Sequence, residues 1–467
     1  MVLSSHTLQR FLPRAVLIFL ALSLTPWGRG QASDVAGTMP EDYLPELKRI
    51  LAQAMQRSPN VIEPLLLIEL REAGRITANA ARLPYLGSNI TYGSTELAES
   101  GSSTNRSRDN GLFYSFGLNQ ALFHWGALKN QTAIANIHLL LAGKNFEKAY
   151  RELSVLLRQA YLQLIVNKAR LRHARDTLQL NRKAIEVAKE RLQRGVASSA
   201  DLAGEELRAR ELALEVSRAE ADLTTGRRTF SRIAGIPELP EPSIPEDIPK
   251  PMYSAALATA LSSALLRDGA KGTVEAQMHE LRLREATLRY QIERVRLYPK
   301  FNAGAGYSLE NTTTVGNTVG QRAVARQTLS VTANWAIFDG FATRAAKMEA
   351  KSMQRAAAAR RDAEMNVLLD EMQSLHRQLV LDVEQLELAE IRGAMAIETR
   401  RRAAEEVGFG NLSPGEVDRA ETGIRLANAR MLEARAALLG RWSQFVAVTG
   451  EDPILNNLPV RHERSKK

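Results

Sequence analysis

The 467-residue sequence contains no cysteine. It can therefore form no disulfide, no thiolate metal site, no cysteine nucleophile and no cysteine-linked lipid anchor. Beyond the amino terminus, no apolar run approaches the roughly 20 residues that a membrane-spanning helix requires. If the mature chain enters a membrane, we expect it to do so as strands.

The amino terminus has the pattern of a secretory signal peptide. Arg10 and Arg14 precede an apolar stretch of about ten residues from Ala15 to Leu24. This stretch is too short for an uncleaved spanning anchor, which is the alternative interpretation. We therefore predict a cleaved signal peptide over residues 1–32. It contains three arginines and no acid, so cleavage lowers the net charge from +10 to +7.

The excess of basic residues does not indicate a nucleic-acid surface. Lysine and arginine are interspersed with glutamate along helical segments, and only the short tail at residues 464–467 is a basic block. We interpret them as solvated helix surface. The seven histidines show no metal-ligand spacing, and no phosphate-binding loop or nucleophile elbow is present. The sequence therefore predicts no catalysis, no cofactor, no metal and no nucleic-acid partner.

The two halves of the sequence repeat each other. Six residues recur 215 positions later, as Pro84/Pro299, Tyr92/Tyr307, Phe123/Phe338, Gly195/Gly410, Phe230/Phe445 and Gly235/Gly450. We predict structural repeats over residues 33–235 and 253–450, because an ordered set of such pairs does not arise by chance. A proline-rich linker over residues 236–252 joins the repeats, and residues 451–467 form a short basic tail.

Each repeat is predicted to begin with a helical segment followed by two strands. The helical segments cover about 42–82, with a break at Ser58, and about 255–297. Strands of about nine residues then flank polar surface loops at 94–110 and 309–326. Apolar residues alternate with small polar residues along each strand, which is typical of a transmembrane β-barrel. Half of a soluble β-sandwich is the alternative, but four strands would not make a stable sandwich alone.

The rest of each repeat is predicted to be a long helical hairpin. Apolar residues recur every seven positions from Leu164 to Leu192, from Leu202 to Phe230 and from Val417 to Phe445. Gly393 and Arg400 interrupt this spacing in the first long helix of the second repeat. The fold class is therefore mixed α and β, a membrane β-barrel with coiled-coil hairpins about 100 Å long.

The hairpin turns contain helix-capping residues. Gly195 and Gly410 follow the long helices, where a left-handed glycine ends a helix. In each turn a serine then precedes an acid by three positions, as Ser198 with Asp201 and Ser413 with Glu416.

Together these features resemble the TolC family of outer-membrane efflux proteins. The matching positions are the strand starts Pro84 and Pro299, the strand exits Phe123, Gly126, Phe338 and Gly340, and the tips Gly195, Val196, Gly410, Asn411 and Leu412. The resemblance implies a homotrimer that shares one barrel in outer-membrane lipid and a tunnel of helices through the periplasm. It also implies a periplasmic adaptor, which would contact the tips, and an inner-membrane drug–proton exchanger or ATP-driven exporter.

The implied function is an exit duct for drugs, small molecules or a secreted protein. A periplasmic adaptor is the main alternative, although it would contain one hairpin rather than two. In the family, acids just past the second tip line the channel entrance; the matching residues here are Glu416 and Arg419, with Asp418 beside them. Glu416 is equally compatible with a capping role and a pore role, whereas capping is the favoured role for Asp201.

Overall fold

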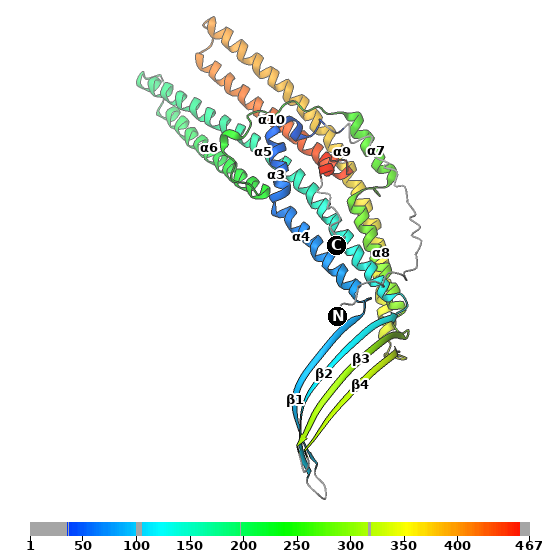
Figure 1. Cartoon of the computed structure of the whole chain (residues 1–467). Helices are drawn as coiled ribbons and strands as arrows, with labels where there is room; N and C mark the ends of the chain where they lie inside the picture. The colour runs from blue at the N-terminus through cyan, green and yellow to red at the C-terminus, as the bar shows by residue number, and fades with distance from the viewer. Residues whose placement is uncertain (1–34, 36, 100–104, 197, 316–318, 458–467) are drawn as a thin grey trace, which may run out of the picture.

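The computed structural model describes residues 35, 37–99, 105–196, 198–315 and 319–457. The predicted signal peptide and the last ten residues of the predicted tail lie outside these ranges. The chain is a mixed α and β protein in which a curved sheet lies at one end and long helices extend from it (Figure 1). Within the described ranges, no helix combines the length and apolarity needed to cross a bilayer.

The elements follow the duplicated order that the sequence predicts. The first half contains α2 (Pro40–Tyr43), α3 (Pro45–Arg57), α4 (Pro59–Ala80), β1 (Tyr85–Glu99), β2 (Asn105–Phe123), α5 (Ala127–Gln193) and α6 (Ser199–Ala234). The second contains η1 (Glu241–Ser243), α7 (Ala255–Asp268), α8 (Val274–Arg294), β3 (Lys300–Val315), β4 (Val319–Asn334), α9 (Ala342–Gly408), α10 (Pro414–Thr449) and η2 (Pro453–Asn457). Helices α5 and α9 each have 67 residues and begin 215 positions apart. This match confirms the duplication, and α9 continues as a helix through Gly393 and Arg400.

Breaks in the shorter helices were only partly predicted. The break at Ser58 is confirmed, since its hydroxyl accepts a hydrogen bond from the Asn60 backbone N–H at 3.3 Å and caps α4. The single helix predicted over 255–297 is wrong, because the chain divides there into α7 and α8. Gly269 and Ala270 both have left-handed backbone angles, and the Thr273 side chain then caps α8. Gly269 provides the left-handed position that ends a helix.

The four strands form one antiparallel sheet in the order β1-β2-β3-β4. They have 15 to 19 residues, so the predicted length of nine is wrong. Most of the two segments predicted to be surface loops, 94–110 and 309–326, is strand. Those segments are rich in Ser, Thr and Asn, and only the apolar alternation of the inner part was recognisable in the sequence. Paired backbone can extend beyond that alternation wherever water reaches both faces.

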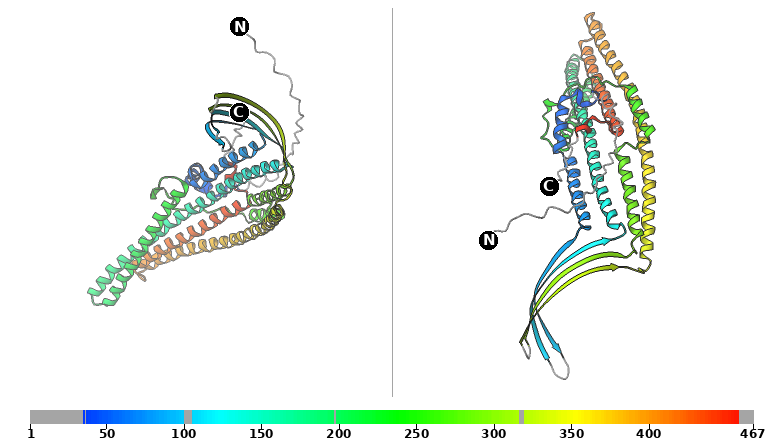
Figure 2. Two further views of the ribbon diagram at one scale, coloured as in Figure 1. Left: turned by 90° about the horizontal axis from the view of Figure 1, so that it is seen from below. Right: turned by 45° about the vertical axis from the view of Figure 1, so that its right-hand side comes forward.

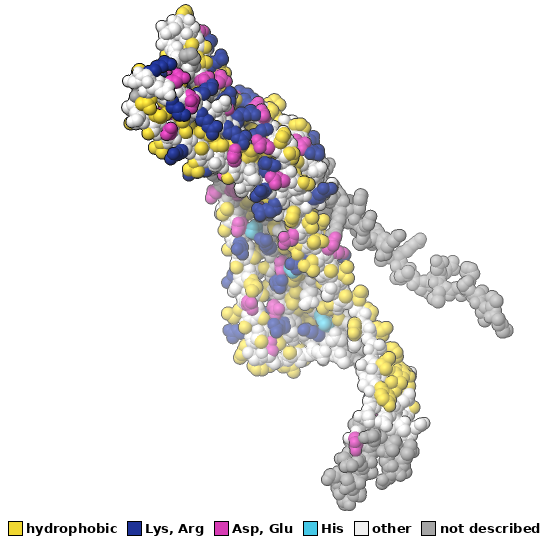
Figure 3. Space-filling model, turned by 90° about the vertical axis from the view of Figure 1, so that its left-hand side faces the viewer, with side chains coloured by type: hydrophobic (Ala, Val, Ile, Leu, Met, Phe, Trp, Pro, Cys, Tyr) yellow, Lys and Arg dark blue, Asp and Glu magenta, His cyan; other side chains and the backbone are white. Residues whose placement is uncertain are grey.

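The strand register places apolar residues on one face of the sheet. Ile90 pairs with Tyr114, which pairs with Leu309 on the next strand. The other residues on this face include Leu86, Tyr92, Leu112, Phe116, Leu118, Phe301, Ala303, Ala305, Leu329 and Val331. Small and polar residues dominate the opposite face, which confirms the predicted alternation. Hydrophobic side chains gather over the strands in the space-filling view (Figure 3).

The helices bury two hydrophobic clusters, each drawn mainly from one repeat. Phe230 of α6 packs with Tyr161 in the first cluster, and Phe445 of α10 packs with Trp442 in the second. Both phenylalanines are fully buried, and they are 215 positions apart. The duplicated positions thus occupy equivalent places in the two cores.

A buried ion cluster joins the amino-terminal helix, α5 and the segment after α10. The fully buried guanidinium of Arg158 donates hydrogen bonds to Asp452, the closest at 2.6 Å, and to Glu41 at 2.8 Å. Burial alone would lower the pKa of Arg158, but the two carboxylates outweigh burial and raise it. Removing one member therefore leaves uncompensated charge inside the protein.

We predict that Asp452→Asn lowers the free energy of unfolding by about 3 kcal/mol, because it leaves the Arg158 charge without its buried carboxylate. Denaturant titration followed by circular dichroism measures the change. Glu246→Gln is the matched control: it removes an exposed carboxylate that pairs with Arg172 and, at 3.7 Å, with Lys168, and should change stability by less than about 1 kcal/mol. Equal stability losses in the two variants would contradict the assigned importance of the buried cluster.

Candidate functional site

The two hairpin tips end the long helices in the same way. Gly195 and Gly410 have φ angles of +74° and +80°. The Val196 N–H donates to the Arg191 carbonyl at 2.9 Å, and the Asn411 N–H donates to the Glu406 carbonyl at 2.9 Å. These bonds are part of the Schellman pattern that satisfies the last carbonyls of a helix. The tips project together away from the sheet (Figure 2).

Exposed apolar side chains lie at these tips. Val196 and Phe409 are each 78% exposed, and Leu412 is 42% exposed. Phe409 was not singled out from the sequence, although it directly precedes Gly410. Gly195 and Gly410 are 215 positions apart, but the exposed apolar side chains around them differ: Val196 lies at the first tip, and Phe409 and Leu412 lie at the second.

The two hairpin turns differ in their helix caps. Ser198 and Asp201 form a reciprocal capping box at the start of α6, and hydrogen bonds from Ser198 lower the pKa of Asp201. Ser413 has the backbone conformation of an N-cap, but its side chain makes no cap hydrogen bond among the described residues. The capping role, one of the two interpretations that the sequence left open for Glu416, is therefore not seen. The Glu416 carboxylate pairs instead with Arg419, one turn further along α10.

Asp418 points away from Glu416 and toward the first hairpin. Its carboxylate accepts a hydrogen bond from the Lys183 ammonium of α5 at 2.9 Å. Two further ion pairs join the same helices, Arg425 with Asp176 and Arg170 with Glu433. We call these three contacts the α5–α10 seam. The sequence offered no signal for it, because each pair is separated by more than 230 positions.

A groove of about 610 Å³ lies beside the second tip, between α9 and α10. Small residues line it, including Ala403, Ala420 and Gly423. Leu412 and the Glu416–Arg419 pair also line this groove. The structure therefore brings two of the candidate entrance residues together with one tip residue. Asp418 is not part of the lining, and Asp201 is on the other hairpin.

Paired left-handed residues connect the strands to the long helices. Trp125 and Gly126 have φ angles of 55° and 82° after β2, and Gly340 and Phe341 have angles of 63° and 69° after β4. The aromatic residue precedes the glycine in the first junction and follows it in the second. Gly126 and Gly340 are accordingly 214 positions apart rather than 215, a shift of one residue in the repeat. At the second junction, hydrogen bonds from Thr343 to Asp339 lower the pKa of that acid.

Aromatic side chains surround the same junctions. Trp125 lies between Phe123 and Tyr298, with ring centroids 4.9 and 5.0 Å apart, and its indole N–H donates to the Pro299 carbonyl at 2.7 Å. Phe338 and Phe341 form an edge contact at the other junction and are 71% and 65% exposed. Pro84 and Pro299 directly precede β1 and β3. We call the aromatic rings at the two junctions the aromatic collar; they are Phe123, Trp125, Tyr298, Phe338 and Phe341.

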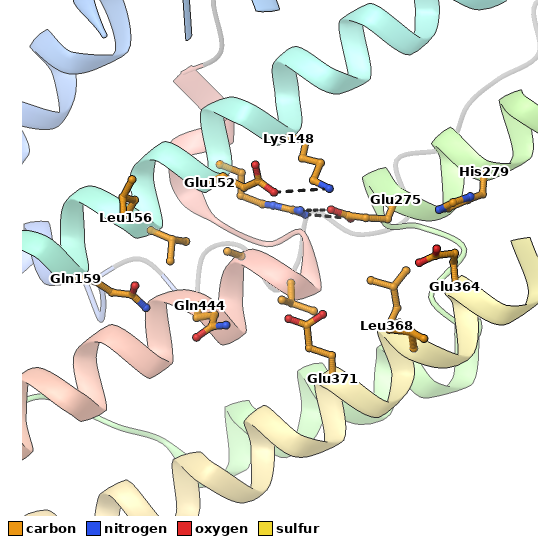
Figure 4. A pocket seen from close by; sticks show the side chains of 15 residues that line it. Lys148, Glu152, Leu156, Gln159, Glu275, His279, Glu364, Leu368, Glu371 and Gln444 are labelled. Atoms are coloured by element: carbon orange, nitrogen blue, oxygen red, sulfur yellow. Dashed lines mark hydrogen bonds and ion pairs between the residues drawn. The ribbon is translucent and has the colours of Figure 1, made fainter. Parts of the chain in front are cut away.

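Another cavity, of about 520 Å³, lies where α5, α8, α9 and α10 meet (Figure 4). Arg151 and Glu275 pair inside it. Burial alone would raise the pKa of Glu275, but Arg151 outweighs burial and lowers it. His279, Glu364 and Glu371 line the same cavity, together with other polar and apolar side chains. In the part of the chain that the structure describes, no three His, Asp or Glu side chains are grouped to hold a metal ion.

Comparisons with solved structures identify the same architecture in outer-membrane channels. The outer-membrane channel OprN is 18% identical, with a TM-score of 0.69 over 87% of this chain and 90% of its own. VceC from Vibrio cholerae is 14% identical, with a TM-score of 0.65 over 88% and 98%. MtrE from Neisseria gonorrhoeae, solved in an open state, is 15% identical, with a TM-score of 0.64 over 87% and 89%. At these identities the likeness concerns the fold.

No curated protein matches the chain. The sequence matches the outer membrane efflux protein family over residues 50–235 and 275–451, which together make up most of its length. Both halves of the duplication thus match the same family. The chain belongs to the outer membrane efflux protein family.

Proposed function

We propose that this protein is the outer-membrane exit duct of a tripartite efflux pump or a type I secretion system. Three copies share one β-barrel, and their hairpins enclose a passive conduit through the periplasm. The observation that carries the proposal concerns the outermost elements of the chain. The sheet, the helices nearest to it and the hairpins beyond them all have their outermost members on the same two sides (Figure 1).

The packing order defines these two sides. In the hairpin region α6 packs on α5, α5 on α10 and α10 on α9. Nearer the sheet, α4 packs on α5, α5 on α8 and α8 on α9. One side therefore presents α6, α4 and β1, and the other presents α9 and β4. A copy placed head to tail would contact the sheet and both sets of helices at once, and such contacts form a closed ring when the rotation between copies closes.

Exposed apolar residues lie on both sides. On α9, Val367, Leu381, Leu388 and Met395 fit a seven-residue spacing and are each 53% to 65% exposed. Ile62, Leu66 and Leu70 on α4 and Leu207 and Leu214 on α6 are also exposed. Seven-residue spacing is the pattern of a coiled-coil contact, and exposed stripes of this length mark an interface.

The apolar face of the sheet has a height that suits a bilayer. It runs on β2 from Leu112 to Phe123, which pairs with Phe301 after an irregularity in the register between Ala121 and Phe123. The span is about 36 Å along the strand and about 26 Å along the membrane normal at a tilt of about 45°. Outer-membrane barrels have an apolar band about 25 Å tall between aromatic girdles. The aromatic collar lies at the helix end of this band and would mark the periplasmic lipid boundary.

The remaining assignments follow from this placement. Residues 1–32 would direct export and be removed, without lipidation. Residues 33–235 and 253–450 would form the two repeats, joined by the linker at 236–252 and followed by the tail at 451–467. The tips with Val196 and Leu412 would contact a periplasmic adaptor. An inner-membrane drug–proton exchanger or ATP-driven exporter would supply the energy, and the conduit itself would catalyse nothing. An adaptor role for this chain is disfavoured, because it contains two hairpins and four barrel-length strands.

We expect the purified protein to be a trimer in detergent, since strand edges left open in lipid would leave backbone groups unpaired. Light scattering should give the mass of three chains. Leu388→Asp on α9 should shift the population toward monomers, whereas the matched Val187→Asp on the interior helix α5 should not. A stable monomer for the unmodified protein would refute this assembly.

The α5–α10 seam should hold the hairpins together and oppose opening. An exposed ion pair contributes about 0.5 kcal/mol, so losing three copies of Lys183–Asp418 should raise the open-to-closed ratio about tenfold. We therefore expect Lys183→Met to increase single-channel open probability in planar bilayers. Lys189→Met is the control, because Lys189 pairs within α5. An equal effect of the two substitutions would exclude the seam as a constraint on opening.

The Glu416–Arg419 pair should set ion selectivity if it lines the entrance. Glu416→Gln would remove three negative charges from the trimer and shift selectivity toward anions, most clearly at low salt. Arg419→Asp should make the channel more cation-selective and more easily blocked by multivalent cations. Asp201→Asn removes a similar charge at the other tip and should leave reversal potentials unchanged. Unaltered selectivity in both α10 variants would place these side chains outside the pore.

A further inference from the structure

We propose that the inner wall of the barrel carries two aromatic binding surfaces, at Tyr85 and Phe113, for planar aromatic cations in transit. The inference rests on the proposed function, because it requires the polar face of the sheet to line the channel. It specifies a chemical class of cargo that the wall retains.

The strand register places both rings on the polar face. Phe113 pairs with Thr91 on β1 and with Glu310 on β3. Its neighbour Tyr114 is on the apolar face, opposite Ile90 and Leu309. Tyr85 lies further toward the helices, where it pairs with Asn119. The two rings are therefore aromatic exceptions on a face that is otherwise mostly small and polar.

Each ring lies over a glycine two positions away on its own strand. A Cβ atom at Gly111 would lie 3.0 Å from a ring carbon of Phe113, and one at Gly87 would lie 3.1 Å from a ring carbon of Tyr85. The missing side chains let the rings lie along the wall rather than stand out from it. A ring held in this way offers its opposite face to a solute. Tyr85 is 70% exposed, and Phe113 is partly exposed.

The charge beside Phe113 favours a cation. Glu310 lies directly opposite Phe113 on the neighbouring strand and is exposed. Arg322 and Arg326 are on the same face one strand further away, on either side of Val324. The carboxylate is thus the nearer charge to the ring. A ring face next to a carboxylate attracts a cation through both the ring quadrupole and the charge.

Three copies would repeat this arrangement around the channel. The two levels are six residues apart along β2, which is about 20 Å at 3.3 Å per residue. Planar aromatic solutes would stack on one level and then on the other, since stacking accepts any flat π surface. Aliphatic cations have no such surface and would pass without stacking.

The experiment measures ethidium, a planar aromatic cation, passing through single trimers in planar bilayers. Ethidium should interrupt the current of the unmodified channel briefly, and Phe113→Ala should shorten these interruptions about tenfold, the factor that corresponds to about 1.4 kcal/mol of stacking. Phe116→Ala removes the same ring from the opposite face of the same strand and should leave the interruptions unchanged. Tetraethylammonium, an aliphatic cation, should affect the current equally in the unmodified, Phe113→Ala and Phe116→Ala channels.

Two additional variants keep the test decisive. Phe113→Leu retains bulk without a ring, so it replaces Phe113→Ala if that variant fails to assemble. Its ethidium interruptions should be shortened in the same way. Glu310→Gln should shorten them if the carboxylate selects the cation. Equal ethidium interruptions in the unmodified, Phe113→Leu and Phe113→Ala channels would overturn the inference while leaving the conduit intact. Absence of any conductance from the unmodified trimer would instead contradict the proposed function.

Discussion

The unpaired backbone along the outer edges of β1 and β4 is the constraint on which the assembly depends. In lipid, each exposed N–H or C=O group costs several kcal/mol because no water can satisfy it. A four-stranded sheet with an apolar face therefore cannot remain alone in an outer membrane. Helices α4 and α6 lie on the same side of the chain as the β1 edge, and α9 lies on the same side as the β4 edge. Closing the sheet would therefore also cover the exposed apolar stripes of these helices.

Features with a local sequence signature were predictable. The glycines at both tips and the alternating strands depend on neighbouring residues. The duplication was also predictable, because the matching residues occur in the same order in both halves, 215 positions apart. The full strand length was not predictable, because the outer parts of the strands have the composition of loops. The seam partner of Asp418 and the buried cluster at Arg158 were also missed. Each depends on side chains that only the folded chain brings together.

The segment from Glu416 to Arg419 shows why matching family positions is insufficient to assign roles. Glu416 pairs with Arg419 on its own helix, whereas Asp418 crosses to Lys183 on the other hairpin. Neighbouring positions on a helix point about 100° apart, so adjacent acids meet different surroundings. At position 419, where the resemblance implies an acid, this chain has arginine. That arginine therefore changes the partner of Glu416 as well as the local charge.

Helix α9 extends without a break from the Gly340–Phe341 junction to the second tip, about 100 Å away. Because the helix is so long, a small rotation at the junction moves the tip a large distance. Each degree of tilt displaces the tip by about 1.7 Å. Two or three degrees therefore exceed the reach of an ion pair such as Lys183–Asp418, which spans 2.9 Å. A rotation of a few degrees at the left-handed junction would therefore be enough to separate the hairpin tips at the far end of the helix.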